Sequence, residues 1–479
     1  MSGVVSVSFQ QKVAPVRPGP VTVSVPATEI FTVAQEYLEA GRIDAAERMI
    51  GHVLGAWPEQ PEALHMKALI QFRRGKIDEA AVLMERSVAL GAGRSSHYRN
   101  LSEVYRMQCR LDEAVAAGRR AVTLDPADPL GPFNLAMVLF DRMEVEACIA
   151  AARHAVELRP NLPQAHMKLG QALLMKGEMA DGWGHYEWRY QIPGAQALMP
   201  ATTQPQWDGR VLAKGETLLL VGDQGFGDVM MFARYVDWAR ERAVEVVIAC
   251  SGEVAPTLAR MFPGIRLVTR WDLVGAFACY CPFSGLPRLH GTTLATIPGT
   301  APYLAADAGR SALWRGRLAA RVRSGDKRVA IAWAGRPTHN NDINRTIALE
   351  TLAPLFEVDG ITLVSVQKGP AVEQMAGYKG RAPLLNLDAE IEDFEDTIAI
   401  LDNVDLVVSV DTSVVHFAGA MGKPVWSMIP FAPDWRWLAG REDSPWYPSL
   451  RLFRHEQPRR WDLLVPRVAD ALRAFVLQS

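Results

Sequence analysis

The segment LLLVGDQGFGDVMMFARYV, residues 218–236, joins an apolar run, a glycine-rich turn and a helical pattern. A strand that leads through glycines into a helix usually binds a phosphate, because free backbone N–H groups and the helix dipole favour anions. Asp223 and Asp228 would repel one, and the glycines lack the spacing of the dinucleotide fingerprint. The turn is therefore either a tight connection in which Asp228 caps its helix, or it presents a carboxylate to a neutral, hydroxyl-bearing substrate.

A second polar group follows the apolar run VDLVVSV. Asp411, Thr412 and Ser413 come next, at the expected start of a helix whose free N–H groups would hold a leaving phosphate. His416 falls in the first turns of that helix. Alternatively, Asp411 and Thr412 only cap the helix and His416 is a core histidine.

Further residues follow the runs RVAIAWAG and ITLVSVQ; these are Gly335, Arg345, Gln367 and Lys368. Gly335 would let a ligand approach the backbone, and Arg345 is expected to open a helix. The two cations would neutralise charge on a departing phosphate. Alternatively, Arg345 pairs with Asp342 or Glu350 on the surface and contributes little, and Gly335 is only a turn.

The composition disfavours two classes of partner. The chain has 479 residues, with 51 Lys and Arg against 53 Asp and Glu, and a formal net charge of −2. Such a balance offers no global field for nucleic acid or an acidic membrane surface. No apolar run approaches the roughly 18 residues that a membrane span needs, so none is predicted.

The cysteines and the N-terminus indicate a cytoplasmic protein. The five cysteines are too scattered for a disulfide framework and form no zinc-type pairs, which favours free thiols in a reducing compartment. The N-terminus lacks the basic start and apolar core of a signal peptide. Residues 1–26, rich in Val, Pro and Ser, are predicted to be a disordered leader.

A period of 34 residues runs through the first half of the chain. It is marked by GRIDAAE at 41, GKIDEAA at 75, CRLDEAV at 109, MEVEACI at 143 and GEMADGW at 177. This is the period of the tetratricopeptide repeat, a helix pair that buries its apolar face by stacking on its neighbours. Small residues recur where helices must approach closely: Ala34, Ala68, Ser102, Ala136 and Gly170 in the first helices, and Ala46, Ala80, Ala114, Ala147 and Gly182 in the second.

Such an array is either a spacer or dimerisation surface, or a concave groove for a peptide or protein. We favour the groove, and expect Gln71, Tyr105 and His166 to line it.

After residue 196 the period ends and short apolar runs alternate with helical patterns. Apolar strands separated by helices indicate parallel sheets, with ligands at the carboxyl ends of the strands. The sequence predicts an α-solenoid followed by two doubly wound α/β domains that face one another across a cleft. The predicted boundaries are a leader at 1–26, repeats at 27–196, a linker and first α/β domain at 197–315, and a second α/β domain at 316–479.

The second half of the chain resembles glycosyltransferases of the GT-B fold, nearest to the heptosyltransferase-like family 9. Its coupling to repeats resembles bacterial tetratricopeptide glycosyltransferases, including those that modify flagellin. The similarity covers roughly residues 27–475 and is carried by GDQGFGDVMMFARY, WAGRPTHNNDINRTIALETLAPL, SVQKGP, SVDTSVVHFAGAMGKPVW and PFAPDWRWLAGREDSPWYPSLRLFR.

The resemblance implies roles for single residues. The Gly-Asp pair that supplies the general base of heptosyltransferases falls on Asp228. Their donor-binding Asp-Thr…His signature falls on Asp411, Thr412 and His416, and their cation on Arg345.

The sequence also departs from the family. The first α/β domain, about residues 210–310, is short for an acceptor lobe, so acceptor recognition is expected to lie on the repeats. A tryptophan-rich segment replaces a shorter loop, and Trp435, Trp437 and Trp446 either stack on a sugar or base or pack internally. Lys368 parallels a donor-binding lysine of animal O-linked N-acetylglucosamine transferase, a looser analogue.

The predicted reaction is a single displacement with inversion. Asp228 takes the proton from an acceptor hydroxyl, while amides at Thr412 and Ser413, with Arg345, stabilise the leaving nucleotide phosphate. The sequence has no Asp-x-Asp motif and no His and Cys cluster, so neither a metal nor a cofactor beyond the nucleotide-sugar donor is predicted. If Asp228 is not the base, His416 is the next candidate.

The favoured acceptor is a flagellin-like protein bound by the repeats. Two alternatives remain open: transfer to a lipid-linked or polysaccharide glycan, and a non-catalytic repeat scaffold with a degenerate transferase domain. Hexosyl, heptosyl and nonulosonyl transfer are not distinguished.

Overall fold

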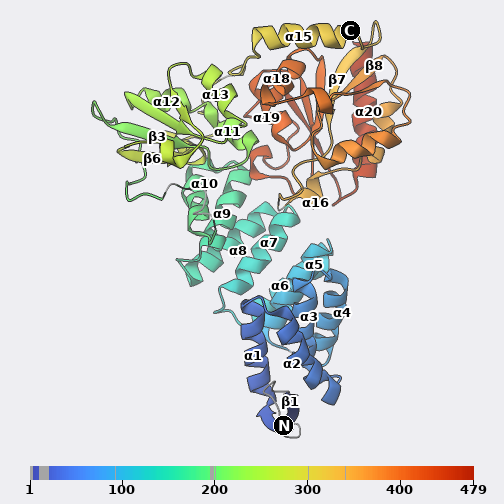
Figure 1. Ribbon diagram of the computed structural model, residues 1–479. Coiled ribbons are helices and arrows are strands. Elements are labelled where there is room, and N and C mark those ends of the chain that lie inside the picture. Colours follow the sequence, from blue (N-terminus) through green and yellow to red (C-terminus); the bar gives the residue numbers. More distant parts are fainter. Residues whose placement is uncertain are drawn as a thin grey trace, which may run out of the picture. The chain divides into compact units, whose positions relative to one another are not determined.

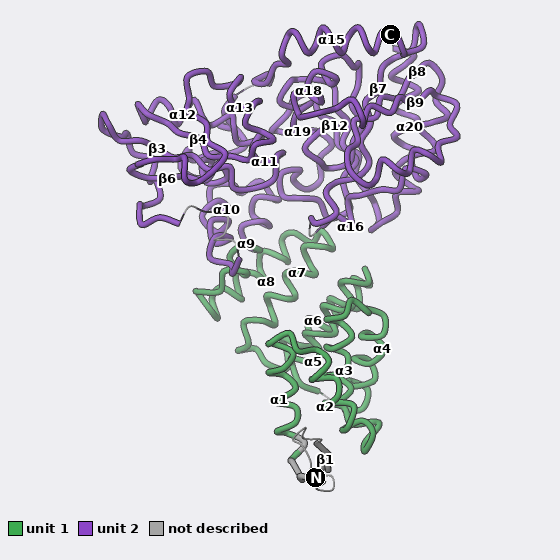
Figure 2. The backbone as a smooth tube through the Cα atoms, viewed as in Figure 1, with its two compact units in different colours: residues 1–168 green, residues 169–479 purple. Residues whose placement is uncertain are grey.

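The computed structural model describes residues 4–9, 21–91, 93–194, 199, 201–299, 301–339 and 341–478. The chain forms two compact units, residues 1–168 and 169–479 (Figure 2). The first is largely helical, and the second contains two parallel sheets (Figure 1). The predicted fold class, a repeat solenoid followed by two Rossmann-like α/β domains, is confirmed, while the predicted boundaries stay predictions.

The first unit is built from helix pairs: α1 Ala27–Glu39 with α2 Ile43–Ala56, α3 Pro61–Arg73 with α4 Ile77–Ala89, α5 Ser95–Met107 with α6 Leu111–Leu124, and α7 Leu130–Asp141 with α8 Val145–Leu158. Most of the predicted small residues have 0 % exposure, namely Ala34, Ala68, Ser102, Ala136, Ala46, Ala80 and Ala114. Ala147 differs, since it is partly exposed and Cys148 beside it occupies the buried position.

The turn inside each helix pair has the same backbone conformation. Its φ is positive at Gly41 (71°), Gly75 (75°), Cys109 (59°) and Met143 (62°). The next N–H then donates to the carbonyl five residues earlier: Arg42 to Tyr37, Lys76 to Gln71, Arg110 to Tyr105 and Glu144 to Leu139. This is the glycine-terminated helix end that satisfies the last free carbonyls. Cys109 and Met143 adopt it without being glycine.

The N-terminal leader differs from the disordered segment predicted from the sequence. Strand β1, Val4–Phe9, pairs antiparallel with β2, Val21–Pro26. Valine alternates with Ser or Thr in both strands, the period of two that a strand requires. The leader's other residues, 1–3 and 10–20, lie outside the described ranges.

Within the described residues, the first sheet of the second unit has the parallel order β5-β4-β3-β6. Its strands are β3 Thr217–Val221, β4 Glu245–Ala249, β5 Arg266–Val268 and β6 Cys279–Pro282. The helices of this domain are α11 Phe226–Ala233, α12 Val236–Arg240, α13 Ala255–Met261 and α14 Leu286–His290. The chain reverses its direction of travel across the sheet between β3 and β6, which creates a topological switch point.

The second sheet, again within the described residues, has the parallel order β12-β11-β10-β7-β8-β9. Its strands are β7 Lys327–Ala332, β8 Ile361–Ser365, β9 Leu384–Asn386, β10 Leu406–Val410, β11 Val425–Ile429 and β12 Leu450–Arg454. The helices are α15 Ala308–Ala319, α16 Asp342–Arg345, α17 Ala353–Phe356, α18 Phe394–Asp402, α19 Ser413–Ala420 and α20 Trp461–Leu477. Its switch point lies between β7 and β10, the place where open α/β sheets bind ligands.

The last repeat lies partly in the second unit and packs on both α/β domains. It comprises α9 Pro163–Lys176, α10 Met179–Tyr186 and the 3₁₀ segment η1 Glu187–Gln191. Trp183 of α10 donates its indole N–H to the carbonyl of Thr292 at 2.8 Å, and its ring centroid lies 5.3 Å from that of Trp435. A Cβ at Gly170 would lie 2.5 Å from the backbone nitrogen of Tyr186, so α9 and α10 approach closely at this glycine, as the sequence predicted. Within the described ranges, no helix is long and apolar enough to span a bilayer.

Candidate functional site

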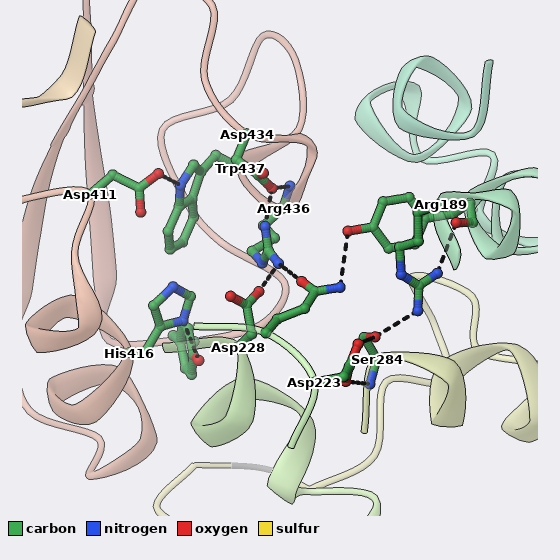
Figure 3. Close-up of polar contacts among 12 residues, drawn as sticks. Arg189, Asp223, Asp228, Ser284, Asp411, His416, Asp434, Arg436 and Trp437 are labelled. Atoms are coloured by element: carbon green, nitrogen blue, oxygen red, sulfur yellow. Dashed lines mark hydrogen bonds and ion pairs between the residues drawn. The ribbon is translucent and has the colours of Figure 1, made fainter. Parts of the chain in front are cut away.

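Asp223, the first aspartate of the glycine-rich loop, is buried in a hydrogen-bond network. It follows β3 at the switch point and is 2 % exposed. Its carboxylate accepts the backbone N–H of Ser284 at 3.1 Å (Figure 3). It also accepts the Tyr190 hydroxyl at 2.9 Å. Arg189 of η1 donates to the Ser284 hydroxyl at 2.6 Å. Asp223 therefore ties the loop to the end of β6 and to the last repeat.

Asp228, the second aspartate, faces the other α/β domain. It lies in the first turn of α11, whose N-cap is Gly225, so it is not the capping residue. Its Oδ1 forms an ion pair with Arg436 of the 3₁₀ segment η8, Trp435–Trp437 (Figure 3). The Asp228 side chain is 21 % exposed and that of Arg436 is 9 % exposed. A carboxylate of the first α/β domain thus meets a guanidinium of the second.

Helices α11 and α19 touch beside this ion pair. A Cβ at Gly227 would lie 2.5 Å from Cδ2 of His416, so only glycine fits there. The His416 Nδ1 is 2.9 Å from the Tyr447 hydroxyl, and its ring centroid is 5.5 Å from that of Trp437. Burial lowers the pKa of His416 to about 3, and the charge of Arg234 acts in the same direction. His416 is thus neutral and enclosed, as expected of a core histidine.

The carboxyl end of β10 brings Asp411 and Arg345 together. The Asp411 Oδ2 accepts the Trp437 indole N–H at 2.9 Å, and its backbone carbonyl accepts from Arg345 Nη1 at 3.1 Å. Burial raises the pKa of Asp411, while Trp437 and Arg345 oppose the rise. Arg345 also pairs with Asp342 at 3.3 Å, and both side chains are largely buried rather than at the surface.

The N-terminus of α19 has the form of an anion site. Thr412 is its N-cap residue but makes no side-chain capping bond, and its hydroxyl lies 3.2 Å from that of Ser409. The Asp411 carboxylate is directed to Trp437, so it does not cap either. Asp411, Thr412 and Ser413 are all partly exposed. First-turn N–H groups without a side-chain acceptor are suited to phosphate.

Arg345 lies directly over Gly335. A Cβ at Gly335 would lie 2.5 Å from Arg345 Nη2, which makes this glycine a packing requirement. Arg345 ends the short helix α16, and the prediction that it opens a helix is wrong. The reason is that the chain becomes extended after it, with the Ile347 N–H donating to the Trp333 carbonyl at 2.9 Å.

Gln367 and Lys368, predicted to bind the donor, each have partners close by in the fold. Gln367 is 4 % exposed, and its amide accepts from the Ala334 N–H at 2.9 Å and donates to the Ala334 carbonyl at 3.0 Å. Lys368 Nζ donates to the Asp388 carbonyl at 2.6 Å and pairs with the Asp388 carboxylate at 2.9 Å. Gln367 thus braces the loop after β7 and Lys368 fixes the segment after β9, and their donor-binding roles stay predictions.

The three tryptophans suggested for stacking are packing residues. Trp435, Trp437 and Trp446 are 1 %, 0 % and 1 % exposed. Trp435 makes edge contacts with Trp183 at 5.3 Å and Trp446 at 6.1 Å between ring centroids. Because neighbouring rings and backbone cover their faces, a sugar or base has no access to them in this arrangement.

The groove residues predicted on the repeats are also engaged internally. Gln71 and His166 are each 7 % exposed, and the Tyr105 hydroxyl donates to Glu85 at 2.9 Å. A cavity of about 340 Å³ instead lies between α1, α3 and α5, lined by Gln35, Leu38, Glu62, His65, Met66, Leu69, Arg73, Ser96, Arg99 and Asn100. In it the His65 Nε2 lies 3.0 Å from the Asn100 amide nitrogen, and burial lowers the pKa of His65 to about 3.

Sequence reasoning missed Arg436 and the Arg189 network. Arg436 lies inside the tryptophan-rich segment, where the aromatic residues drew attention and the cation between Trp435 and Trp437 did not. An arginine flanked by two buried tryptophans is itself a signal, because a guanidinium in such surroundings needs a carboxylate partner. Within the described ranges, no group of three His, Cys, Asp or Glu side chains is arranged to hold a metal ion.

Two comparisons of sequence identify relatives. The tetratricopeptide-repeat family model matches residues 32–96 and 66–129. Protein FlbA of Caulobacter vibrioides is 28 % identical over 331 residues, which cover 63 % of this chain and 54 % of FlbA. The chain thus contains tetratricopeptide repeats and is distantly similar to FlbA. It spans about half the length of that relative.

Solved structures of repeat proteins are similar to a part of the chain. A crystal structure of MamA is 21 % identical, covers 34 % of this chain and 96 % of MamA, and has a TM-score of 0.30. PilF of Pseudomonas aeruginosa is 18 % identical, covers 36 % of this chain and 79 % of PilF, and has a TM-score of 0.33. At these TM-scores the likeness says nothing about function.

Proposed function

We propose that the protein is a glycosyltransferase, which moves a sugar from a nucleotide-activated donor to an acceptor hydroxyl with inversion. One observation carries the proposal: the carboxylate after β3 and the anion-binding elements after β10 are brought together by the Asp228–Arg436 ion pair and the Gly227–His416 contact. Two parallel α/β domains in one compact unit are compatible with the GT-B fold.

The donor's phosphates are assigned to the switch point between β7 and β10. There the first turn of α19 offers backbone N–H groups, and Arg345 adds a guanidinium hydrogen-bonded to the Asp411 carbonyl at 3.1 Å. Groups fixed in place before the reaction stabilise charge on a leaving phosphate without reorganising. Gly335 keeps the backbone beneath Arg345 free of a side chain.

The acceptor hydroxyl is assigned to Asp228. Its carboxylate is partly exposed and is paired with a guanidinium, which favours its ionised form. In the proposed step it takes the hydroxyl proton while the oxygen attacks the anomeric carbon and the bond to the nucleotide phosphate breaks. The leaving charge is neutralised by protein groups, so the step is metal-independent.

The acceptor is proposed to be a protein held by the repeats, flagellin-like by resemblance. The cavity between α1, α3 and α5 is lined by both apolar side chains, such as Leu38 and Leu69, and polar ones, such as Asn100, which suits an extended peptide. Transfer to a lipid-linked or polysaccharide glycan keeps the same chemistry and differs only in what the repeats bind.

A non-catalytic scaffold is the second candidate, and the crowding of the site favours it. Arg436 occupies one oxygen of Asp228, and Trp437 occupies Asp411. A degenerate transferase whose site has closed on its own side chains would have these contacts.

Incubation of the full chain with UDP, ADP, GDP and CMP sugars distinguishes the two candidates. If the protein is a transferase, one donor raises its apparent melting temperature, because a ligand that binds only the folded state stabilises that state. It then releases the nucleotide when an acceptor is added. A scaffold binds none of the donors and releases no nucleotide.

A further inference from the structure

Arg436 is a buried charged residue. Its side chain is 9 % exposed, and its Nε is buried without a hydrogen-bond partner. The pKa of Arg436 is lowered, and burial is the largest cause of the shift. Removing a guanidinium from water costs several kcal/mol unless carboxylates compensate it. Two carboxylates form ion pairs with it, and the Gln224 amide oxygen accepts a longer hydrogen bond from it at 3.4 Å.

The two carboxylates that hold Arg436 come from different places. Asp434 precedes it on the same segment, pairs with its Nη1 and accepts its backbone N–H at 3.1 Å. Asp228 comes from α11 of the other α/β domain and pairs with Nη2. The guanidinium is thus anchored on its own segment by Asp434 and holds Asp228 with its other end (Figure 3).

The ion pair occupies one oxygen of Asp228. Arg436 binds Oδ1, whereas Oδ2 lies 3.2 Å from the position where a Cβ of Gly225 would be. Because Gly225 has no side chain, the space beside Oδ2 is not filled from the loop. A base that must accept a proton along one direction benefits when one oxygen is fixed and the other is accessible.

We propose that Arg436 is a positioning residue that holds Asp228 ionised and oriented, with Oδ2 left to receive the proton of the acceptor hydroxyl. This inference rests on the proposed glycosyl transfer. In the step the hydroxyl proton passes to Asp228, the new C–O bond forms at the anomeric carbon, and the nucleotide leaves with the bonding electrons. Arg436 neither gains nor loses a proton and does not touch the donor.

A double-mutant cycle on the full chain tests the inference. Initial rates are measured from pH 4 to pH 9 for the wild type, Arg436→Gln, Arg436→Lys, Asp228→Asn and the Arg436→Gln/Asp228→Asn double variant. Arg441→Gln is the matched control, since Arg441 lies on the same segment and pairs only with the exposed Asp443 in the described contacts. Urea midpoints of all variants report whether each is folded.

The inference predicts a split between the kinetic constants. Arg436→Gln lowers kcat by about 10²-fold, the usual cost of a misplaced catalytic group, with the donor KM unchanged. The acid limb of its pH–rate profile moves up by about 1–3 pH units, because the cation that favoured the charged carboxylate of Asp228 has been removed. The same substitution has no further effect in the Asp228→Asn background. Arg436→Lys keeps the acid limb in place and recovers part of kcat, and Arg441→Gln behaves as wild type.

Three results overturn the inference and leave glycosyl transfer standing. The kcat losses of the two single variants add in the double variant, the acid limb of Arg436→Gln does not move, or Arg436→Gln raises the donor KM with a normal kcat. A wild type that releases no nucleotide with any donor removes the proposed function and this inference together. If Arg436→Gln does not fold, Arg436→Lys decides: a lowered kcat with an unmoved acid limb supports positioning, and an unaltered kcat overturns it.

Discussion

Two aspartates five positions apart in one loop have opposite surroundings. Asp223 lies at the switch point of the first sheet, where three donors from Ser284 and Tyr190 saturate it. Asp228 lies one helical turn further on, where α11 meets the second α/β domain. The first fixes the loop, and the second carries a partly exposed carboxylate into the candidate site.

This difference separates the effects of two isosteric substitutions. Asp228→Asn is expected to lower turnover by about 10²–10⁴ with donor affinity unchanged, because a positioned base is lost and the phosphate site is not. Asp223→Asn is expected to destabilise the fold by about 1–3 kcal/mol, since buried donors lose a charged acceptor. Steady-state kinetics, donor calorimetry and urea unfolding measure the three quantities. Near-normal turnover of Asp228→Asn would remove the base from this residue.

Sequence patterns locate much of the candidate site but not its side-chain contacts. Arg345 and Asp411 follow β7 and β10, neighbouring parallel strands of the second sheet whose carboxyl ends meet at one edge, and Asp228 follows β3 of the first sheet. The direction of a side chain depends on neighbours distant in sequence. Gln367 turns inward to the loop after β7 for this reason, and Arg436 is recognisable only once α11 is seen opposite it.

At the scale of elements, the sequence period predicts the repeat helices, and continuous apolar runs predict the central strands of the sheets. The strands named in the sequence, including β3, β7, β8 and β10, are the apolar central ones. The strands that were not predicted are β6, β9 and β12, which lie at the edges of their sheets, and β11, which lies beside β12. Such strands bury less surface, so their sequences need not be continuously apolar.

The turn within each repeat gives a prediction at this scale. Cys109 adopts φ 59° at a turn where the two preceding repeats have Gly41 and Gly75, and a non-glycine residue in the left-handed region costs about 1 kcal/mol or more. Cys109→Gly is therefore expected to stabilise the first unit by up to about 1 kcal/mol, the gain being reduced by glycine's greater freedom in the unfolded chain.

Gly75→Ala is the matched control, because it places a side chain at φ 75° in the preceding repeat where nothing lies within 4 Å of the new Cβ. It is expected to destabilise the unit by about 1 kcal/mol through backbone strain alone. Urea unfolding followed by circular dichroism measures both variants. Destabilisation by Cys109→Gly would mean that packing of the thiol outweighs the strain.

At the scale of the whole molecule, the second unit is held together by more than its two sheets. Thr257 of α13 donates to Glu395 of α18 at 2.6 Å, and Arg260 donates to the same carboxylate at 2.8 Å. Trp183 of the last repeat touches both α/β domains. A truncation intended to remove the repeats should therefore keep α9 and α10, since deleting them would expose Trp435.

Buried neutral histidines predict how stability depends on pH. The pKa values of His416 and His455 are lowered to about 3 and about 4, chiefly by burial, and that of His65 to about 3. Between these values and about 6.5 the unfolded chain binds protons that the folded chain does not, so stability falls as pH falls. Each imidazole is expected to cost about 1.4 kcal/mol per pH unit below 6.5. Urea midpoints at pH 7.5 and pH 5 that do not differ would contradict this account.

The most direct test of the central claim is nucleotide release by the full chain, measured for each donor sugar with wild type and Asp228→Asn side by side. The account predicts that one donor binds both proteins equally and that only the wild type releases its nucleotide at an appreciable rate when an acceptor is present. Equal release by the two proteins, or binding of no donor by either, would contradict it.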